Sequence, residues 1–595
     1  MPRNKVLERA KVSMPSGRSP YDVSQIRSYD SLAADINVCY AQPMVAGTKG
    51  KISRQCFTRT AQVVAPAFHS VTEHFDFFIV PIHALWRSWE NWKVNINDLQ
   101  DTLTVPMDAN YDTVLTLPSY APRMDFNGII PRTWRTGDTY TSQGVINMVA
   151  RRCNDAFRLL DALGYDEAIT NAVGIGRNRV MNLFMLAAYQ KCYYDHYRNT
   201  AYEANDPYAY NLDWLVADSA HNGLLDPDND QTVPVNKKDI VVAQKLLDLH
   251  RVNYRNDYFH NIYPSMNYVS SAITGASNYS LPSNLSGASV NGTNTNNQPM
   301  LVRYTGANQV SPSILSDGSS PAYSISVQQI RAIFALDKLM RASAYAPKHV
   351  RDQYKALYGV DGVDDPDMLS ERIGSFQSDV VFQEVTNMTA SGTADLGELG
   401  AKGIGGQKGS NEIDFYCKYD SIVIGLHYFM PRARYDAFGL HPFNIKIDKY
   451  DFFVRAFEHL GLRPFYRYYI DGSASAVVLG WTEANFEYKV LPDLNTGMFK
   501  RKFCCAIVNE SGGNYTFNVT NQDSSKLSTF VPHTESINAS FVDADYFKVA
   551  AEDLNNIFKV AVEGDHSREV CQFFGEFRIN CAIVAPMSVH SQPTL

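Results

Sequence analysis

The sequence lacks the cysteine patterns of disulfide-rich and zinc-binding proteins. Its nine cysteines are odd in number and scattered, without a C-x-x-C pair or a cysteine–histidine cluster at zinc spacing. The first residues lack the apolar core of a signal peptide, and no apolar run reaches the length that spans a membrane. We therefore expect a soluble protein with reduced thiols, made in a cytoplasm and not inserted into a membrane.

Common catalytic signatures are also missing, since neither H-E-x-x-H nor G-x-S-x-G occurs. The glycine-rich segment from Leu396 to Gly409 has Lys408 where a dinucleotide-binding loop has its third glycine, so we interpret it as a flexible connection. Paired carboxylates for glycoside cleavage would converge only in three dimensions, and the sequence leaves that alternative open. We predict that the protein is not an enzyme and has no catalytic residues, metal-ligating set or cofactor.

Positive charge is scarce overall, because the formal net charge is −8. This excludes a protein that binds nucleic acid over its whole surface, so any such contact requires a local basic region. The first such region is a basic N-terminal arm, which we place at residues 1–30. An ordinary solvated terminus is the alternative. The candidate nucleic-acid contacts in the arm are Arg3, Lys5, Arg9, Lys11 and Arg18.

Two further segments, 193–199 and 250–264, interleave arginines with aromatic residues. Single-stranded DNA binds to such surfaces through phosphate neutralisation and base stacking. The candidate contacts in these segments are Tyr197, Arg198, Arg251 and Arg255. The alternative is aromatic packing between parts of the chain, with the arginines at interfaces.

The stretch between residues 270 and 320 is rich in Ser, Asn, Gly and Thr and cannot bury enough apolar area to form its own core. It predicts a linker, a loop or a polar surface protrusion held by flanking structure. If this stretch is an exposed protrusion, its candidate contact residues are Asn278, Asn284, Asn291 and Asn296.

Strand patterns flank a helical and loop-rich middle. A strand is predicted over 63–81 and a pair of strands over 413–431, and period-two alternation over 571–583 predicts a strand with one face in the core. Helices are predicted over 144–165, 178–200, 327–343 and 347–358, with Gly164 and Gly359 as stops. The pattern favours an antiparallel β-sandwich whose connections have grown into insertions.

Several short segments in order resemble the major capsid proteins of the Microviridae, particularly the gokushovirus-like branch of these small single-stranded DNA phages. They include AAYQKCYYDHYRN, HRVNYRNDYFHNIYPSMNY and DKYDFFVRAFEHLGLRPF. The matching residues are 63–92, 187–199, 250–268, 327–341, 379–387, 396–405, 422–442, 448–465 and 543–558. The segment NLFMLAAY lacks the proline that usually precedes this tyrosine in the family, and residues 465–530 match poorly.

The resemblance implies a mainly β fold, an eight-stranded antiparallel jelly roll with long helical and loop insertions. Residues 31–595 would form one domain, with insertions over about 93–410 and the last core strand at 571–585. The 270–320 stretch is the best candidate for the family's variable protrusion, with host attachment as its implied role.

The function that the resemblance implies is assembly. About 60 copies would form pentamers and then a T=1 icosahedral shell around a circular single-stranded DNA genome. Implied partners are the genome, internal scaffolding and DNA pilot proteins and a host receptor, with assembly in the bacterial cytoplasm and localisation in the virion. The alternatives are a carbohydrate-binding β-sandwich adhesin or fibre protein, and a glycoside-active β-sandwich enzyme.

Overall fold

The structure of the chain is a computed structural model. It describes residues 17–61, 71–86, 89, 93, 119–120, 158–164, 181–212, 246, 248–264, 289–293, 299–305, 309–314, 335, 338–339, 342, 346, 349–359, 369–386, 399–408, 411–432, 435–436, 442–449, 451–455, 462–466, 469, 478–495, 537–538, 541–542, 544–549 and 571–589.

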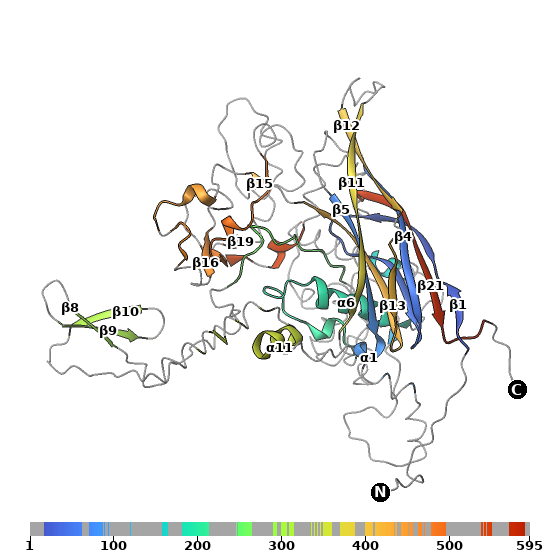
Figure 1. The fold of residues 1–595 in the computed structure, drawn as a ribbon, viewed down its shortest axis with the longest axis horizontal. Helices are drawn as coiled ribbons and strands as arrows, with labels where there is room; N and C mark the ends of the chain where they lie inside the picture. Colours follow the sequence, from blue (N-terminus) through green and yellow to red (C-terminus); the bar gives the residue numbers. More distant parts are fainter. Residues whose placement is uncertain are drawn as a thin grey trace, which may run out of the picture.

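One large antiparallel sheet dominates the described part of the chain (Figure 1). Its main path runs in the order β1-β21-β4-β12-β11-β5-β14-β3, while β2 pairs with β21 and β13 pairs with β4. The strands are β1 (Ser19–Asp22), β2 (Gln25–Ser31), β3 (Asn37–Met44), β4 (Lys49–Thr60), β5 (Val71–Pro81), β11 (Glu371–Thr386), β12 (Leu399–Lys408), β13 (Ile413–Tyr416), β14 (Ser421–Pro431) and β21 (Phe573–Ala585). Strands from both ends of the sequence are therefore neighbours, as in a sandwich closed by distant pairings.

The sheet curls so that its two halves share one apolar core. Side chains from β4, β13 and β21 pack there against side chains from β3, β5, β11 and β14. The largest fully buried ones include Tyr40, Phe75 and Phe77. A curled antiparallel sheet with an interior of this kind confirms the predicted mainly β, jelly-roll class of fold.

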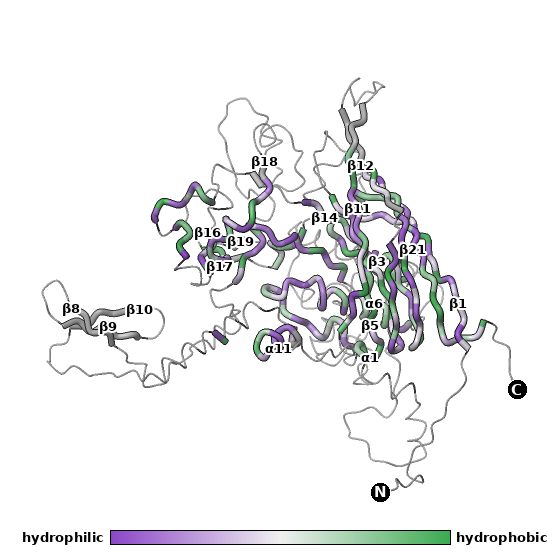
Figure 2. The backbone as a smooth tube through the Cα atoms, in the orientation of Figure 1, coloured by the Kyte–Doolittle hydropathy of each residue, from purple (hydrophilic) through white to green (hydrophobic). Residues whose placement is uncertain are grey.

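The two halves differ in how many faces are covered. Along β21 and β4, buried and exposed residues alternate, which confirms the period-two strand predicted over 571–583 (Figure 2). Along β14 almost every residue is buried, and β5 is buried throughout its second half. Strands buried on both faces need a second layer, and the chain supplies one from its insertions.

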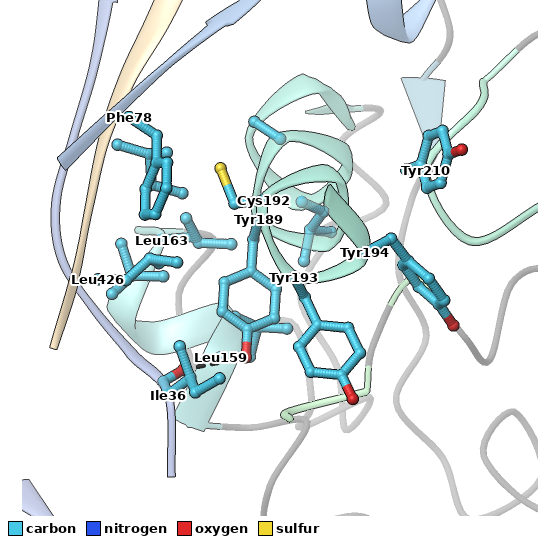
Figure 3. Packing of buried hydrophobic residues seen from close by; sticks show 14 of the residues in the cluster. Ile36, Phe78, Leu159, Leu163, Tyr189, Cys192, Tyr193, Tyr194, Tyr210 and Leu426 are labelled. Atoms are coloured by element: carbon cyan, nitrogen blue, oxygen red, sulfur yellow. Dashed lines mark hydrogen bonds between the residues drawn. The ribbon is translucent and has the colours of Figure 1, made fainter. Parts of the chain in front are cut away.

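That second layer centres on α6 (Phe184–Cys192), which continues as the π-helix η4 (Tyr193–Tyr197). Figure 3 shows Tyr189 and Cys192 of α6 packed near Phe78 and Leu426 of the sheet, with Leu159 and Leu163 beside them. The Tyr189 hydroxyl donates a hydrogen bond of 2.9 Å to the Ile36 carbonyl, which fixes the helix against the sheet.

The remaining elements are short. The helices are α1 (Ile82–Leu85), α11 (Val350–Tyr358), η5 (Pro207–Ala209), η7 (Pro442–Ile445), η9 (Phe486–Tyr488) and η11 (Ala544–Phe547). The strands are β6 (Ser119–Tyr120), β7 (Met181–Asn182), β8 (Ser289–Thr293), β9 (Pro299–Thr305), β10 (Gln309–Ile314), β15 (Tyr435–Asp436), β16 (Leu462–Tyr466), β17 (Val478–Glu483), β18 (Leu494–Asn495), β19 (Ile537–Asn538) and β20 (Phe541–Val542).

The structure changes two boundaries drawn from the sequence. Residues 19–31 form β1 and β2, so the sheet begins well before residue 31 and the predicted arm of residues 1–30 is shorter. The insertion region placed at about 93–410 contains β11 and β12, which lie in the middle of the sheet, so it ends before Glu371. The two strands predicted over 413–431 are present as β13 and β14, and they pair with different neighbours.

The interpretation of the glycine-rich segment as a flexible connection is wrong. Residues 399–408 are strand β12, paired with β11 and β4. A side chain on Gly403 would lie 2.5 Å from the Thr60 side chain, and one on Gly405 would lie 3.2 Å from that of Val380. Glycine is needed at Gly403 because a neighbouring side chain fills the space, which is a tertiary requirement with no local signature.

Candidate interaction surfaces

The basic arm lies mostly outside the described residues, including Arg3, Lys5, Arg9 and Lys11. Arg18 is described and is exposed directly before β1. Strand β1 is the last strand on its side of the main sheet path. The segment before Arg18 therefore joins the molecule at an edge of the large sheet.

Tyr197 and Arg198 are placed inside the chain. The Tyr197 hydroxyl donates a 2.6 Å hydrogen bond to Asp76 Oδ2, and burial holds the pKa of Tyr197 well above its usual value. Arg198 is 8% exposed, and its Nε and Nη1 donate to the carbonyls of Tyr194 (3.1 Å) and Glu203 (3.0 Å). Tyr197 therefore joins η4 to the sheet, whereas Arg198 binds carbonyls within its own segment and offers no free cation to a phosphate.

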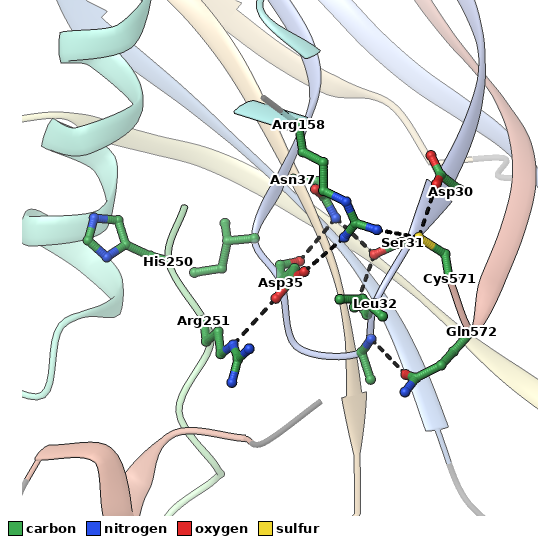
Figure 4. A network of polar contacts seen from close by, with 12 residues as sticks. Asp30, Ser31, Leu32, Asp35, Asn37, Arg158, His250, Arg251, Cys571 and Gln572 are labelled. Atoms are coloured by element: carbon green, nitrogen blue, oxygen red, sulfur yellow. Dashed lines mark hydrogen bonds and ion pairs between the residues drawn. The ribbon is translucent and has the colours of Figure 1, made fainter. Parts of the chain in front are cut away.

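Arg251 belongs to a polar junction beneath the surface (Figure 4). Its Nε lies 3.5 Å from Asp35 Oδ1, while Arg158 Nη1 lies 3.3 Å from Asp35 Oδ2. Backbone hydrogen bonds from Ile36 N to His250 O and from Val252 N to Ala34 O join the same segments. Arg251 therefore ties an insertion to the turn between β2 and β3.

Arg255 is exposed, and its Nη2 lies 3.4 Å from His74 Nε2. The His74 ring stacks on Tyr428 at 5.0 Å, and burial lowers the pKa of His74 to about 4. The imidazole is therefore neutral at pH 7 and leaves the charge of Arg255 uncompensated by this contact. Of the four predicted arginines with described side chains, Arg18 and Arg255 are exposed.

The predicted attachment stretch contains an antiparallel three-stranded sheet of β8, β9 and β10. Asn291 lies in β8, opposite Leu301. Asn278, Asn284 and Asn296 lie outside the described residues.

One exposed apolar surface was not predicted from the sequence. We define the aromatic patch as Phe443, Ile447, Phe452, Phe453, Val454, Tyr488 and Leu491, all of them exposed. Their segment matched the capsid motif around residues 448–465, but that pattern says nothing about exposure. A second exposed group lies on the outer face of the sheet, where the Arg59 guanidinium sits 4.9 Å from the centre of the Phe57 ring.

Buried carboxylates in the sheet are used for structure. Glu73 and Asp76 are 0% and 3% exposed, and both accept hydrogen bonds from side chains of neighbouring segments. Among the described residues, no group of three His, Cys, Asp or Glu side chains is placed to hold a metal ion. Within the same residues, no helix is long and apolar enough to cross a membrane.

The described residues show a mainly β, sandwich-type fold with an exposed aromatic patch and buried carboxylates that are used for structure. Comparison with protein families gives a match to the phage capsid protein (F protein) over residues 154–595, well over half of the chain. A search of curated proteins gives no match. The chain therefore belongs to the F capsid protein family, the major capsid proteins of the Microviridae. Membership of this family favours a structural role in the virion over an adhesin or a glycosidase.

Proposed function

We propose that the protein builds a T=1 icosahedral shell of about 60 copies, assembled from pentamers, around a circular single-stranded DNA genome. The observation that carries the proposal is the capsid family match over residues 154–595 on a curled antiparallel sheet. The shell would assemble in the bacterial cytoplasm with the help of internal scaffolding and DNA pilot proteins.

Subunit association in such a shell requires apolar surface that folding leaves uncovered. The insertion between β5 and β11 buries the outer face of β5 and β14, and the connection between β14 and β21 carries the exposed aromatic patch. The bare sandwich would lack this area. Insertions that enlarge the subunit surface therefore support a contact function rather than a catalytic one.

Genome binding would use exposed cations and aromatic rings without reading sequence. Described groups with that chemistry include Arg18, Arg255 and the Arg59–Phe57 pair. We propose the remaining arm residues, Arg3, Lys5, Arg9 and Lys11, as further contacts. Host attachment is proposed for the region of β8, β9 and β10, whose polar composition suits an exposed surface.

The test is expression of the full chain with the neighbouring genes of its phage, followed by electron microscopy and nuclease treatment. Uniform small spheres that protect single-stranded DNA are the expected result. A monodisperse monomer under every condition would contradict the shell. Spheres without protected DNA would retain the shell and refute the genome-binding assignment.

A further inference from the structure

The aromatic patch exposes more large apolar side chains in one place than protein surfaces usually do. Ile447 is 92% exposed, Leu491 74% and Tyr488 50%, and the other four members are 37–48% exposed. Single apolar side chains are common on protein surfaces, whereas clusters of large ones mark interaction sites. Seven such residues within two short segments require an explanation beyond chance exposure.

The four aromatic rings of the patch form one connected group. The Phe443 ring lies 5.6 Å from Phe452 and 6.3 Å from Tyr488, and Phe453 lies 6.4 Å from Tyr488, measured between ring centroids. The edge-on orientation of these pairs is a favourable aromatic geometry. The segments around residues 443–454 and 486–491 therefore form one surface.

Polar contacts within the two segments of the patch hold them in shape. The Asp451 carboxylate accepts hydrogen bonds from the backbone N–H of Asp448 (2.9 Å) and Ile447 (3.1 Å). Lys446 donates to the Asp451 carbonyl, pairs with Glu487 and lies 4.7 Å from the Tyr488 ring centroid. The turn that presents Ile447 is thus fixed before any partner arrives, which lowers the entropy cost of association.

The charges around the patch identify the class of partner. Residues 442–455 and 483–491 contain four acids and four cations. The acids are Asp448, Asp451, Glu483 and Glu487, and the cations are Lys446, Lys449, Arg455 and Lys489. A neutral surface of mixed sign does not attract a polyanion such as DNA. It is complementary to another surface of the same composition, as in contacts between identical subunits.

We infer that the aromatic patch is a contact surface for a second copy of this chain in the assembled shell. The inference rests on the proposed shell and names one surface that builds it. The seven side chains would form the apolar centre of the contact, and the mixed charges its polar rim. A stable contact buries about 800 Å² on each partner, and large exposed side chains of this kind are its usual centre.

The first test changes exposed side chains only. The double variant Ile447→Glu with Leu491→Glu places carboxylates in the contact, and Val589→Glu, at a position 61% exposed outside the patch, is the matched control. We expect both variants to unfold at the same temperature as the wild-type subunit. We expect the yield of particles from the double variant to fall by about tenfold or more, as for loss of central interface residues. Normal yield from the double variant would overturn the inference.

The second test does not depend on assembly of a damaged subunit. Cysteines are introduced by Ile447→Cys and, as control, Val589→Cys, and maleimide labelling is compared between free subunits and intact particles after subtraction of the wild-type signal. We expect labelling at position 447 to slow by about tenfold in particles, as for a side chain in a water-excluding contact. Labelling of position 447 at the same rate in intact particles as in free subunits would refute this contact but not the shell. Failure of the wild-type chain to form any particle would instead sink the shell.

Discussion

Glu73 shows how single residues inside the sandwich are held. Its side chain is fully buried, and its Oε1 accepts hydrogen bonds from His427 (2.8 Å), Tyr29 (2.8 Å) and Thr58 (3.0 Å). Burial alone would raise its pKa, but the hydrogen bond and charge of His427, with the other donors, lower it to about 2. A buried carboxylate of this kind stabilises the fold only while it remains ionised.

This arrangement predicts a defined loss of stability in acid. Because the pKa of Glu73 is below its ordinary 4.5, its contribution is complete above about pH 4.5 and is lost as pH falls towards 2. Glu73→Gln should lower the free energy of unfolding by about 3 kcal/mol at pH 7 and reduce the pH dependence between 4.5 and 2. Denaturant unfolding of subunits across this range measures both effects. The same pH dependence in the variant as in the wild type would contradict the assignment, and Glu412→Gln, an exposed acid, is the control.

Asp35 connects the turn between β2 and β3 to two arginines from elsewhere in the chain. Its side chain is 3% exposed and faces Arg158 and Arg251, which lie far apart in sequence within the connection between β5 and β11. We expect Asp35→Asn to lower the free energy of unfolding by about 2 kcal/mol, because two guanidinium groups lose their anionic partner.

The control variant, Asp414→Asn, removes an acid that is 77% exposed and 3.6 Å from Lys51. Its cost should be at most about 0.5 kcal/mol. Urea unfolding compares the two, and equal losses would refute the structural role of Asp35.

At the scale of elements, β14 is buried on both faces, and this limits which side chains it can accommodate. Its side chains pack into the sandwich core on one face and against α6 on the other. A side chain on Gly425 of β14 would lie 2.8 Å from both Cys39 Sγ and the Phe77 ring. Interiors packed at crystal density cannot absorb an added methyl group without displacing neighbours. Central strands therefore tolerate less change than the sheet face that meets solvent.

A matched pair of glycine substitutions tests this difference. Gly425→Ala should lower the free energy of unfolding by about 1–3 kcal/mol through overpacking. Gly406→Ala, in β12, places its methyl group no closer than 3.5 Å to any neighbour, so its effect should be within about 0.5 kcal/mol. Thermal or denaturant unfolding of both variants measures the difference. A Gly425 variant as stable as the Gly406 variant would contradict the two-sided packing of β14.

At the scale of the whole molecule, the chain separates a rigid scaffold from contact surfaces. The sheet brings strands from residues 19–81 together with strands from 371–431 and 573–585, so folding must close long loops before the core forms. The exposed aromatic patch and the exposed arginines lie outside the sandwich core and can change without disturbing it. Substitutions on these surfaces are therefore expected to change the stability of the subunit little.

The basic arm gives a prediction at this scale. Deletion of residues 2–18 ends before β1 at Ser19, so the subunit should fold with unchanged unfolding temperature. Packaging of single-stranded DNA or binding of an internal scaffold should weaken, because five cations are removed. Replacement of the same five residues by glutamine should have the same effect if charge is the cause. Normal DNA content in particles of both variants, measured by absorbance and nuclease protection, would refute the role of the arm.

The sequence alone determined the features that repeat over short distances. Alternation over 571–583 predicted β21, the left-handed Gly359 ends α11 as predicted, and the order of short motifs indicated the capsid family. Each follows from local backbone geometry or from a run of neighbouring residues. These features need no knowledge of what the rest of the chain places beside them.

Tertiary structure alone decided which face of each pattern is covered and which partner each charge has. An arginine between aromatic residues gives the same sequence pattern whether its side chain is exposed, as that of Arg255 is, or buried, as that of Arg198 is. Arg251 and Asp35 meet only because the insertion returns to the turn after β2. The glycines of β12 and the exposed aromatic patch depend likewise on distant segments. Periodicity fixes which residues share a face, whereas packing of distant segments determines whether that face is buried.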